Sequence, residues 1–144
     1  MSLDLVAKLV SVALTGAVEI WAAVPAGLAL GLHPVLVAVA TSAGGIVAVL
    51  AVSFVGEGVR ARLLRGHAPS ATARPGFVKR AWGRYGAPGL GLIAPLVVGA
   101  PIGTAMGLAL GAPASRLRAW MSVGVVVWST GLTALGAAAL EVIA

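Results

Sequence analysis

Charged residues divide this chain into long apolar segments. From Ile20 to Gly56 there is no Asp, Glu, Lys or Arg, a run of 37 residues. A helix that crosses a membrane takes about 20 residues, so we predict one span over residues 35–56, started by the turn at His33-Pro34. Residues 20–34 are too few for a second crossing, and they suit a dip to the middle of the membrane and back.

The flanking segments follow the same pattern. Residues 3–18 are apolar apart from Asp4 and Lys8, and we predict a helix here that ends at Glu19. Residues 85–115 carry no charge, and residues 119–140 form an uninterrupted final span. The chain therefore alternates short apolar segments with full-length spans.

The segment 95–111 is apolar enough for a membrane, yet it contains Pro95, Pro101 and four glycines. Proline removes a backbone donor and clashes with the preceding turn, which leaves carbonyl groups that hydrocarbon cannot satisfy. A broken backbone at membrane depth persists only where it packs in protein or lines a wet cavity, and such breaks mark transport sites. We therefore expect the functional site in this segment.

The chain resembles itself at an offset of 80 residues. Between residues 27 and 56, nine of 30 positions are identical to the residue 80 further on, against roughly three or four expected by chance from this composition. Compositional bias toward Ala, Gly, Leu and Val is the alternative explanation. The identities include the pentapeptide Gly27-Leu28-Ala29-Leu30-Gly31, which recurs as Gly107-Leu108-Ala109-Leu110-Gly111.

Basic residues indicate on which side each loop lies, because they stay in the cytoplasm. Seven of them fall within residues 57–84, so we place this loop inside. If residues 85–115 crossed the membrane, Arg116 and Arg118 would lie outside. If the segment dips and returns, nine of the ten basic residues are inside. A dip in each half gives two inverted halves that meet in mid-membrane.

The predicted fold is an all-α integral membrane protein with a single membrane domain, residues 1–144. It comprises repeat one (1–59), a basic cytoplasmic loop (60–84) and repeat two (85–144). Each repeat is a re-entrant broken-helix hairpin followed by a transmembrane helix. The composition agrees, since 60% of the residues are hydrophobic, 10% are charged and the mean hydropathy is +1.05.

Residue content argues against several function classes. There is no cysteine, and His33 and His67 are far apart, so we expect no metal site and no cofactor. No nucleophile–base pair and no phosphate-binding loop is recognisable, so we do not expect an enzyme. The net charge of +6 lies mostly in one loop and reflects topology, so we expect no nucleic-acid partner.

Several residue groups together carry a likeness to a known family. They are Glu19 followed by Pro25 and a glycine-rich run to Gly31, then Arg84-Tyr85-Gly86, Pro95-Leu96 through Gly103-Thr104-Ala105, and Gly124 with Trp128. In these residues the chain resembles the small multi-drug export protein family, relatives of the DedA (VTT) membrane proteins. The resemblance implies two re-entrant hairpins with inverted symmetry. It also implies movement of phosphorylated lipid carriers or lipids across a bilayer, often with proton dependence.

Glu19 is the foremost candidate for chemistry. An acid between two apolar stretches is costly in a membrane and is by default a functional hypothesis. Removal of water favours the uncharged acid, so such a group can take up and release a proton. The alternative is an interfacial charge at the end of a helix, since Glu19 lies only 11 residues after Lys8.

Two further groups of residues complete the predicted site. The breaks would supply free backbone groups and one hydroxyl to a substrate, with close helix packing by small residues as the alternative. Arginines at the inner mouth would gather anionic headgroups, with topology anchoring as the alternative. The first group is Pro25, Gly27, Gly99, Pro101, Gly103 and Thr104, and the second is Arg84, Arg116 and Arg118.

These observations predict a small membrane transporter or flippase for an anionic lipid or lipid carrier, proton-coupled through Glu19. Two alternatives remain open: a proton-coupled exporter like the small multidrug resistance transporters, and an accessory membrane protein that does not transport. The expected partners are membrane lipids and further copies of the chain, because so small a domain encloses little of a pathway by itself. We expect a multi-pass protein of a bacterial inner (cell) membrane.

Overall fold

The computed structural model describes residues 2–64 and 76–143, and side chains over residues 2–59 and 85–142. Every regular element in these ranges is a helix, as the sequence predicts. The helices are α1 (Leu3–Val18), α2 (Ile20–Ala29), α3 (Pro34–Leu64), α4 (Gly76–Val97), α5 (Ala100–Ala109) and α6 (Ala114–Ile143).

The first helix ends at Glu19, as predicted. Glu19 has an extended backbone (φ −151°, ψ 117°), and its N–H still donates to the carbonyl of Thr15, 2.7 Å away. The Glu19 side chain then caps the next helix, because its Oε1 accepts from the backbone N–H of Trp21 at 3.4 Å. Acidic residues are favourable N-caps because they satisfy an amide that has no partner within the helix. We call α1, α2 and their junction at Glu19 hairpin one, and the junction its tip.

The second hairpin breaks at Val98-Gly99, between α4 and α5. Gly99 has φ 82° and ψ 157°, a conformation open only to glycine, and it precedes α5 without a side-chain cap. Pro101 causes no break, since it occupies the first turn of α5, where its missing N–H costs nothing. Pro95 lies within α4, whose kink is at Gly86. We call α4, α5 and their junction at Val98-Gly99 hairpin two, and this junction its tip.

The turns that follow α2 and α5 have the same backbone geometry. Gly31 and Gly111 both have positive φ, 71° and 83°. The N–H of Leu32 donates to the Gly27 carbonyl at 3.2 Å, and the N–H of Ala112 donates to the Gly107 carbonyl at 3.0 Å. The recurring pentapeptide therefore builds the same helix ending twice, in the manner of a glycine-terminated helix.

Burial follows the same offset of 80 residues. Of the 40 residues from 20 to 59, 34 are buried, half-buried or exposed like the residue 80 further on. The exceptions are positions 21, 30, 40, 46, 51 and 57. Compositional bias does not produce such agreement in three dimensions, so the internal similarity extends from sequence to packing.

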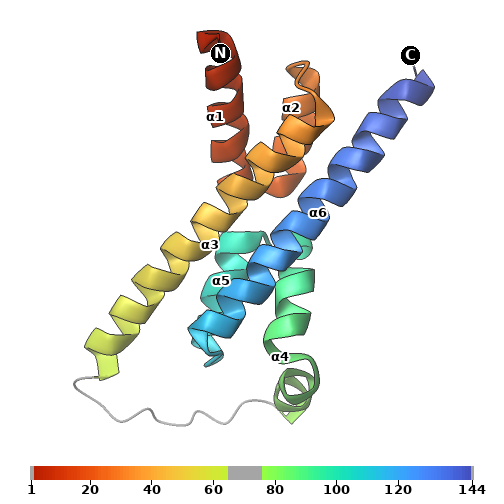
Figure 1. The fold of residues 1–144 in the computed structure, drawn as a ribbon. Coiled ribbons are helices and arrows are strands. Elements are labelled where there is room, and N and C mark those ends of the chain that lie inside the picture. Colours follow the sequence, from red (N-terminus) through yellow and green to blue (C-terminus); the bar gives the residue numbers. More distant parts are fainter. Residues whose placement is uncertain (1, 65–75, 144) are drawn as a thin grey trace.

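Two helices are long and apolar enough to cross a membrane, Pro34–Val59 within α3 and Ala114–Val142 within α6. They contain the predicted spans 35–56 and 119–140, and each is longer than predicted. They run side by side in opposite chain directions (Figure 1), and a Cβ on Gly45 would lie 2.7 Å from Cγ1 of Val125. Gly45 and Val125 are themselves 80 residues apart, so the two halves meet at equivalent positions.

The hairpins pack against these two helices from opposite ends of the molecule (Figure 1). Hairpin one packs along the N-terminal part of α3, and hairpin two packs along the N-terminal part of α6. Both tips lie near the middle of the molecule, whereas the turns at Gly31 and Gly111 lie at opposite ends. At 1.5 Å per residue the 10-residue helices α2 and α5 are about 15 Å long, half of a typical ~30 Å hydrocarbon layer.

Candidate functional site at the two hairpin tips

The two tips meet at the Glu19 carboxylate. A Cβ built on Gly99 would lie 3.6 Å from Oε2 of Glu19 and 3.4 Å from the carbonyl oxygen of Val18. The carboxylate thus caps the N-terminus of α2 through Oε1, and Oε2 lies beside Gly99, the residue that precedes α5. Glu19 itself is half-buried.

A hydrogen bond of the Trp21 side chain connects hairpin one with hairpin two. Its indole Nε1 donates to the carbonyl of Leu96 at 2.8 Å. Leu96 lies in the last turn of α4, where a carbonyl has no partner within the helix. The tips also contain the carbonyls of Thr15 and Ala94, which accept from the N–H groups of Glu19 and Val98. These C-terminal carbonyls are therefore occupied, and the carboxylate faces helix N-termini.

Helix N-termini favour negative charge because their amides are unpaired and the helix dipole is positive there. Glu19 is the acidic side chain placed at these N-termini among the described residues.

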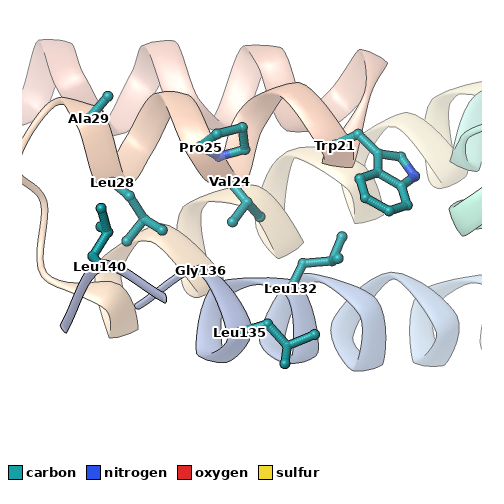
Figure 2. Close-up of a pocket in the computed structure, with 9 residues that line it drawn as sticks. All are labelled: Trp21, Val24, Pro25, Leu28, Ala29, Leu132, Leu135, Gly136 and Leu140. Carbon is teal, nitrogen blue, oxygen red and sulfur yellow. The ribbon is translucent and has the colours of Figure 1, made fainter. Parts of the chain in front are cut away.

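An apolar groove begins beside this site and runs between α2 and α6 (Figure 2). Its volume is about 540 Å³, which is within the range of small-molecule sites. Trp21 lies at the end nearest α4 and α5, while Ala29 and Leu140 lie at the other end. The groove is lined by Trp21, Val24, Pro25, Leu28, Ala29, Leu132, Leu135, Gly136 and Leu140.

The remaining predicted residues of the broken segments lie away from Glu19 in different settings. Pro25 lines the groove and is exposed, six residues beyond Glu19. Gly103 is buried, and a Cβ there would meet the Cβ of Ala94 at 2.4 Å, which is a close-packing role. Thr104 is fully buried, and its hydroxyl donates to the carbonyl of Ala100 at 2.7 Å.

Gly27 and Pro101, the other two predicted residues of this group, also lie in helix contacts or helix turns. Gly27 is buried where a Cβ would meet Cγ1 of Val37 at 2.8 Å, and Gly107 has the equivalent contact with Cδ2 of Leu117 at 2.6 Å. Pro101 is half-buried in the first turn of α5, two residues after Gly99. Of the predicted residues, the structure therefore brings together Glu19 and Gly99.

The predicted arginines do not form one cluster among the described side chains. Arg118 pairs with Glu57, with Nη1 2.7 Å from Oε2, and its guanidinium lies 5.1 Å from the centre of the Phe54 ring. Arg116 is exposed at the start of α6. The side chain of Arg84 lies outside the described residues. The ion pair does place residues 57 and 118 at the same end of the molecule, consistent with a shared side.

Sequence reasoning missed Trp21 and the groove. The aromatic residue two positions after Glu19 was a usable signal, but its partner Leu96 is 75 residues away in sequence. It also missed the partner of Glu57, which lies 61 residues away, on Arg118. Within the described residues there is no group of three or more His, Cys, Asp or Glu side chains that could hold a metal ion.

Comparison with protein-family models, with curated proteins and with solved structures finds no match to this chain. The function must therefore be argued from the residues and their geometry.

Proposed function

We propose that this chain is a small proton-coupled membrane transporter that moves an anionic lipid or lipid carrier between leaflets. One observation carries the proposal: the Glu19 carboxylate caps α2 at the junction of α1 and α2 and lies beside Gly99, at the junction of α4 and α5. The likeness to the small multi-drug export and DedA families, stated above on sequence, points to the same class.

The membrane setting is supported by the surface of the described helices. Large apolar side chains are exposed around them, including Leu14 at 66%, Phe54 at 62% and Leu135 at 71%. Helices that are apolar on every face belong in hydrocarbon or in the core of a large protein, and these apolar faces are exposed over the described residues. The two helices α3 and α6 would cross the bilayer, and the hairpins would enter it from opposite sides.

The inverted-repeat arrangement is supported by the recurrence at 80 residues. The contact of a Gly56 Cβ with Leu108 (2.6 Å) has its counterpart in that of a Gly136 Cβ with Leu28 (2.8 Å). Each half thus packs the tip-to-turn helix of one hairpin against the long helix of the other half. Transporters with inverted repeats place their sites between the halves, near the bilayer midplane, on discontinuous helices.

In the proposed cycle, Glu19 exchanges its proton as the anionic headgroup arrives. Protonation would leave Glu19 without charge at the N-terminus of α2, and the headgroup would take the place of that charge. Release of the headgroup lets Glu19 ionise again against the same amides. The arginines at the inner end, Arg116 and Arg118, would attract anionic headgroups to the entrance by about 1 kcal/mol each.

The second candidate is export of a lipophilic cation, coupled to the same proton. One observation favours it: all nine residues lining the groove are uncharged, and the only acid near the groove's inner end is Glu19 among the described side chains. An ionised carboxylate beside an apolar groove suits a cationic amphiphile. The two candidates differ in whether substrate binds to the protonated or to the ionised Glu19.

The test uses purified protein in liposomes across a pH series. One assay follows the transfer of phosphatidic acid labelled on its acyl chain with a fluorophore that dithionite quenches in the outer leaflet, and a parallel assay follows ethidium. For the anionic lipid, the wild-type rate should rise toward low pH with a slope of at most about one decade per pH unit, because one proton is taken up. Glu19→Gln, which has nearly the same size, should remove this pH dependence while leaving the protein folded.

Two controls make the result decisive. Glu57→Gln changes a carboxylate that pairs with Arg118 far from the tips, and it should leave the slope unchanged. Unchanged transport by Glu19→Gln at every pH would refute the role of Glu19. Transport of ethidium alone would replace the lipid candidate with the cation candidate, and transport of neither probe would favour the accessory protein.

A further inference from the structure

We propose that the groove between α2 and α6 holds one acyl chain of a membrane lipid, with the lipid headgroup at the Glu19 end. This inference rests on the proposed function, because it names the part of the substrate that the tips do not bind. The proposed site is a hydrocarbon-binding groove. It is defined by its apolar lining and by the Glu19 carboxylate near its inner end.

The lining of the groove fits hydrocarbon and nothing charged. Eight of its nine residues are aliphatic, proline or glycine, and the ninth is Trp21. The indole nitrogen of Trp21 is already bonded to the carbonyl of Leu96, so the groove presents the apolar part of this ring. An anionic headgroup in the groove would lose its water without finding a partner, which is strongly unfavourable.

The position of the groove fits an acyl chain better than a compact apolar molecule. It follows α2 from Trp21, beside the tips, to Ala29 at the turn, and α6 accompanies it from Leu132 to Leu140 (Figure 2). It therefore runs along the long helices, the direction that acyl chains take in a bilayer when α3 and α6 cross it. The only carboxylate among the described residues near its inner end is Glu19, two residues before Trp21. A polar end joined to a long uncharged groove is complementary to an amphiphile with one polar head and a hydrocarbon tail.

Gly136 keeps the groove open. A Cβ at this position would lie 2.8 Å from Cδ1 of Leu28, the end of a flexible side chain, so a larger residue would fit by filling the groove. Gly56 is the matched control 80 residues earlier, where a Cβ would lie 2.6 Å from Cδ1 of Leu108. Gly56→Leu makes the same steric demand outside the groove.

The experiment uses the full chain in phosphatidylcholine vesicles that contain phosphatidic acid with a diazirine on one acyl chain. After illumination, mass spectrometry locates the labelled residues. We expect label concentrated in residues 21–29 and 132–140. Gly136→Leu should reduce that label by about fivefold or more, because the side chain fills a cavity of small-molecule size, whereas Gly56→Leu should not.

A second pair of variants covers the case in which Gly136→Leu does not fold. Ala29 and Ala109 are exposed, equivalent positions at the ends of α2 and α5, and only Ala29 lines the groove. Ala29→Phe should lower the label in the groove and Ala109→Phe should not. Label spread evenly over all exposed apolar faces, unchanged by either groove variant, would overturn the proposal.

A second copy of the chain is the other occupant that the test can reveal. The chain has no cysteine, so Ala29→Cys introduces a single thiol at the mouth of the groove. Rapid disulfide-linked dimers of Ala29→Cys in membranes, together with absent lipid label, would overturn the acyl-chain proposal. Failure here is distinct from failure of the proposed function, because labelling is measured at fixed pH without transport. A normal Glu19→Gln effect on pH dependence would then stand by itself.

Discussion

Substitution of Gly124 by alanine tests one of the two closest backbone approaches between helices among the described residues. A Cβ at Gly124 would lie 1.9 Å from the carbonyl oxygen of Gly91 on α4. This carbonyl is the one that Pro95 deprives of its helical donor, so α6 approaches α4 at a site where the backbone is already interrupted. Neither atom belongs to a flexible side chain, and the two helices must separate to accept the methyl group.

The magnitude follows from the geometry. A carbon and a carbonyl oxygen are in ordinary contact at about 3.3 Å, so α6 must move away from α4 by roughly 1.4 Å at this point. Overpacking of this kind costs about 1–3 kcal/mol. The higher helix propensity of alanine returns up to about 1 kcal/mol. We therefore expect Gly124→Ala to destabilise the protein despite that gain.

Gly131→Ala is the matched control on the same helix. No atom lies within 4 Å of a Cβ at Gly131, so this variant carries the propensity gain without the clash. The assay is reversible unfolding in mixed detergent micelles, with the two variants measured side by side. Because the propensity gain is common to both, their free energies of unfolding should differ by about 1–3 kcal/mol, with Gly124→Ala the less stable.

The same reasoning applies to the other half of the chain. A Cβ at Gly44, the position 80 residues earlier, would lie 1.8 Å from the carbonyl oxygen of Ala13 on α1. Gly44→Ala should therefore be destabilising to a similar extent. If Gly124→Ala and Gly44→Ala proved as stable as Gly131→Ala, the close approach of the hairpins to α3 and α6 would be refuted.

The remaining predictions concern the ion pair, the buried hydroxyl and the topology. A double-mutant cycle with Glu57→Gln and Arg118→Gln should give a coupling of about 0.5–1 kcal/mol, because the pair is half-exposed, and a coupling near zero would show that it does not form. Thr104→Val should change stability by less than about 1 kcal/mol, since its hydroxyl only bonds within its own helix; a loss of transport with intact stability would instead assign that hydroxyl to the substrate. Single cysteines at Ser115 and Gly31 should react with an impermeant thiol reagent from opposite sides of the membrane, and labelling from one side would contradict the crossing of α3.

The sequence predicts the helices well because local signals decide where they begin and end. Glu19 is an N-cap residue after an apolar run, and the helix 3–18 ends there as predicted. Pro34 begins α3 as expected for a first helical residue. The prolines of the second half were harder to interpret, because a proline in a first turn and a proline in a helix interior have opposite effects on the backbone. Pro101 belongs to the first kind, and the break falls at Gly99.

The site is only half predictable for a different reason. An acid in an apolar run identifies Glu19, but its neighbour Gly99 and the Trp21 partner Leu96 are 80 and 75 residues further along the chain than Glu19 and Trp21. Such contacts depend on how two hairpins meet, and no local pattern encodes the meeting point. The groove likewise depends on Gly136 facing α2, which follows from the packing of α6 and not from its own sequence.

The two tips differ in residue type, and among the described residues only the first carries an acidic side chain. Glu19 and Gly99 are 80 residues apart and precede equivalent helices. Two acids at these positions would place like charges together and disfavour ionisation of both. A glycine at the second position removes that repulsion. Its positive φ and missing side chain also admit the Glu19 carboxylate and the Val18 carbonyl to within 3.6 and 3.4 Å of where a Cβ would be. The difference between Glu19 and Gly99 thus places one carboxylate, and not two, at the site that the proposed transport cycle uses.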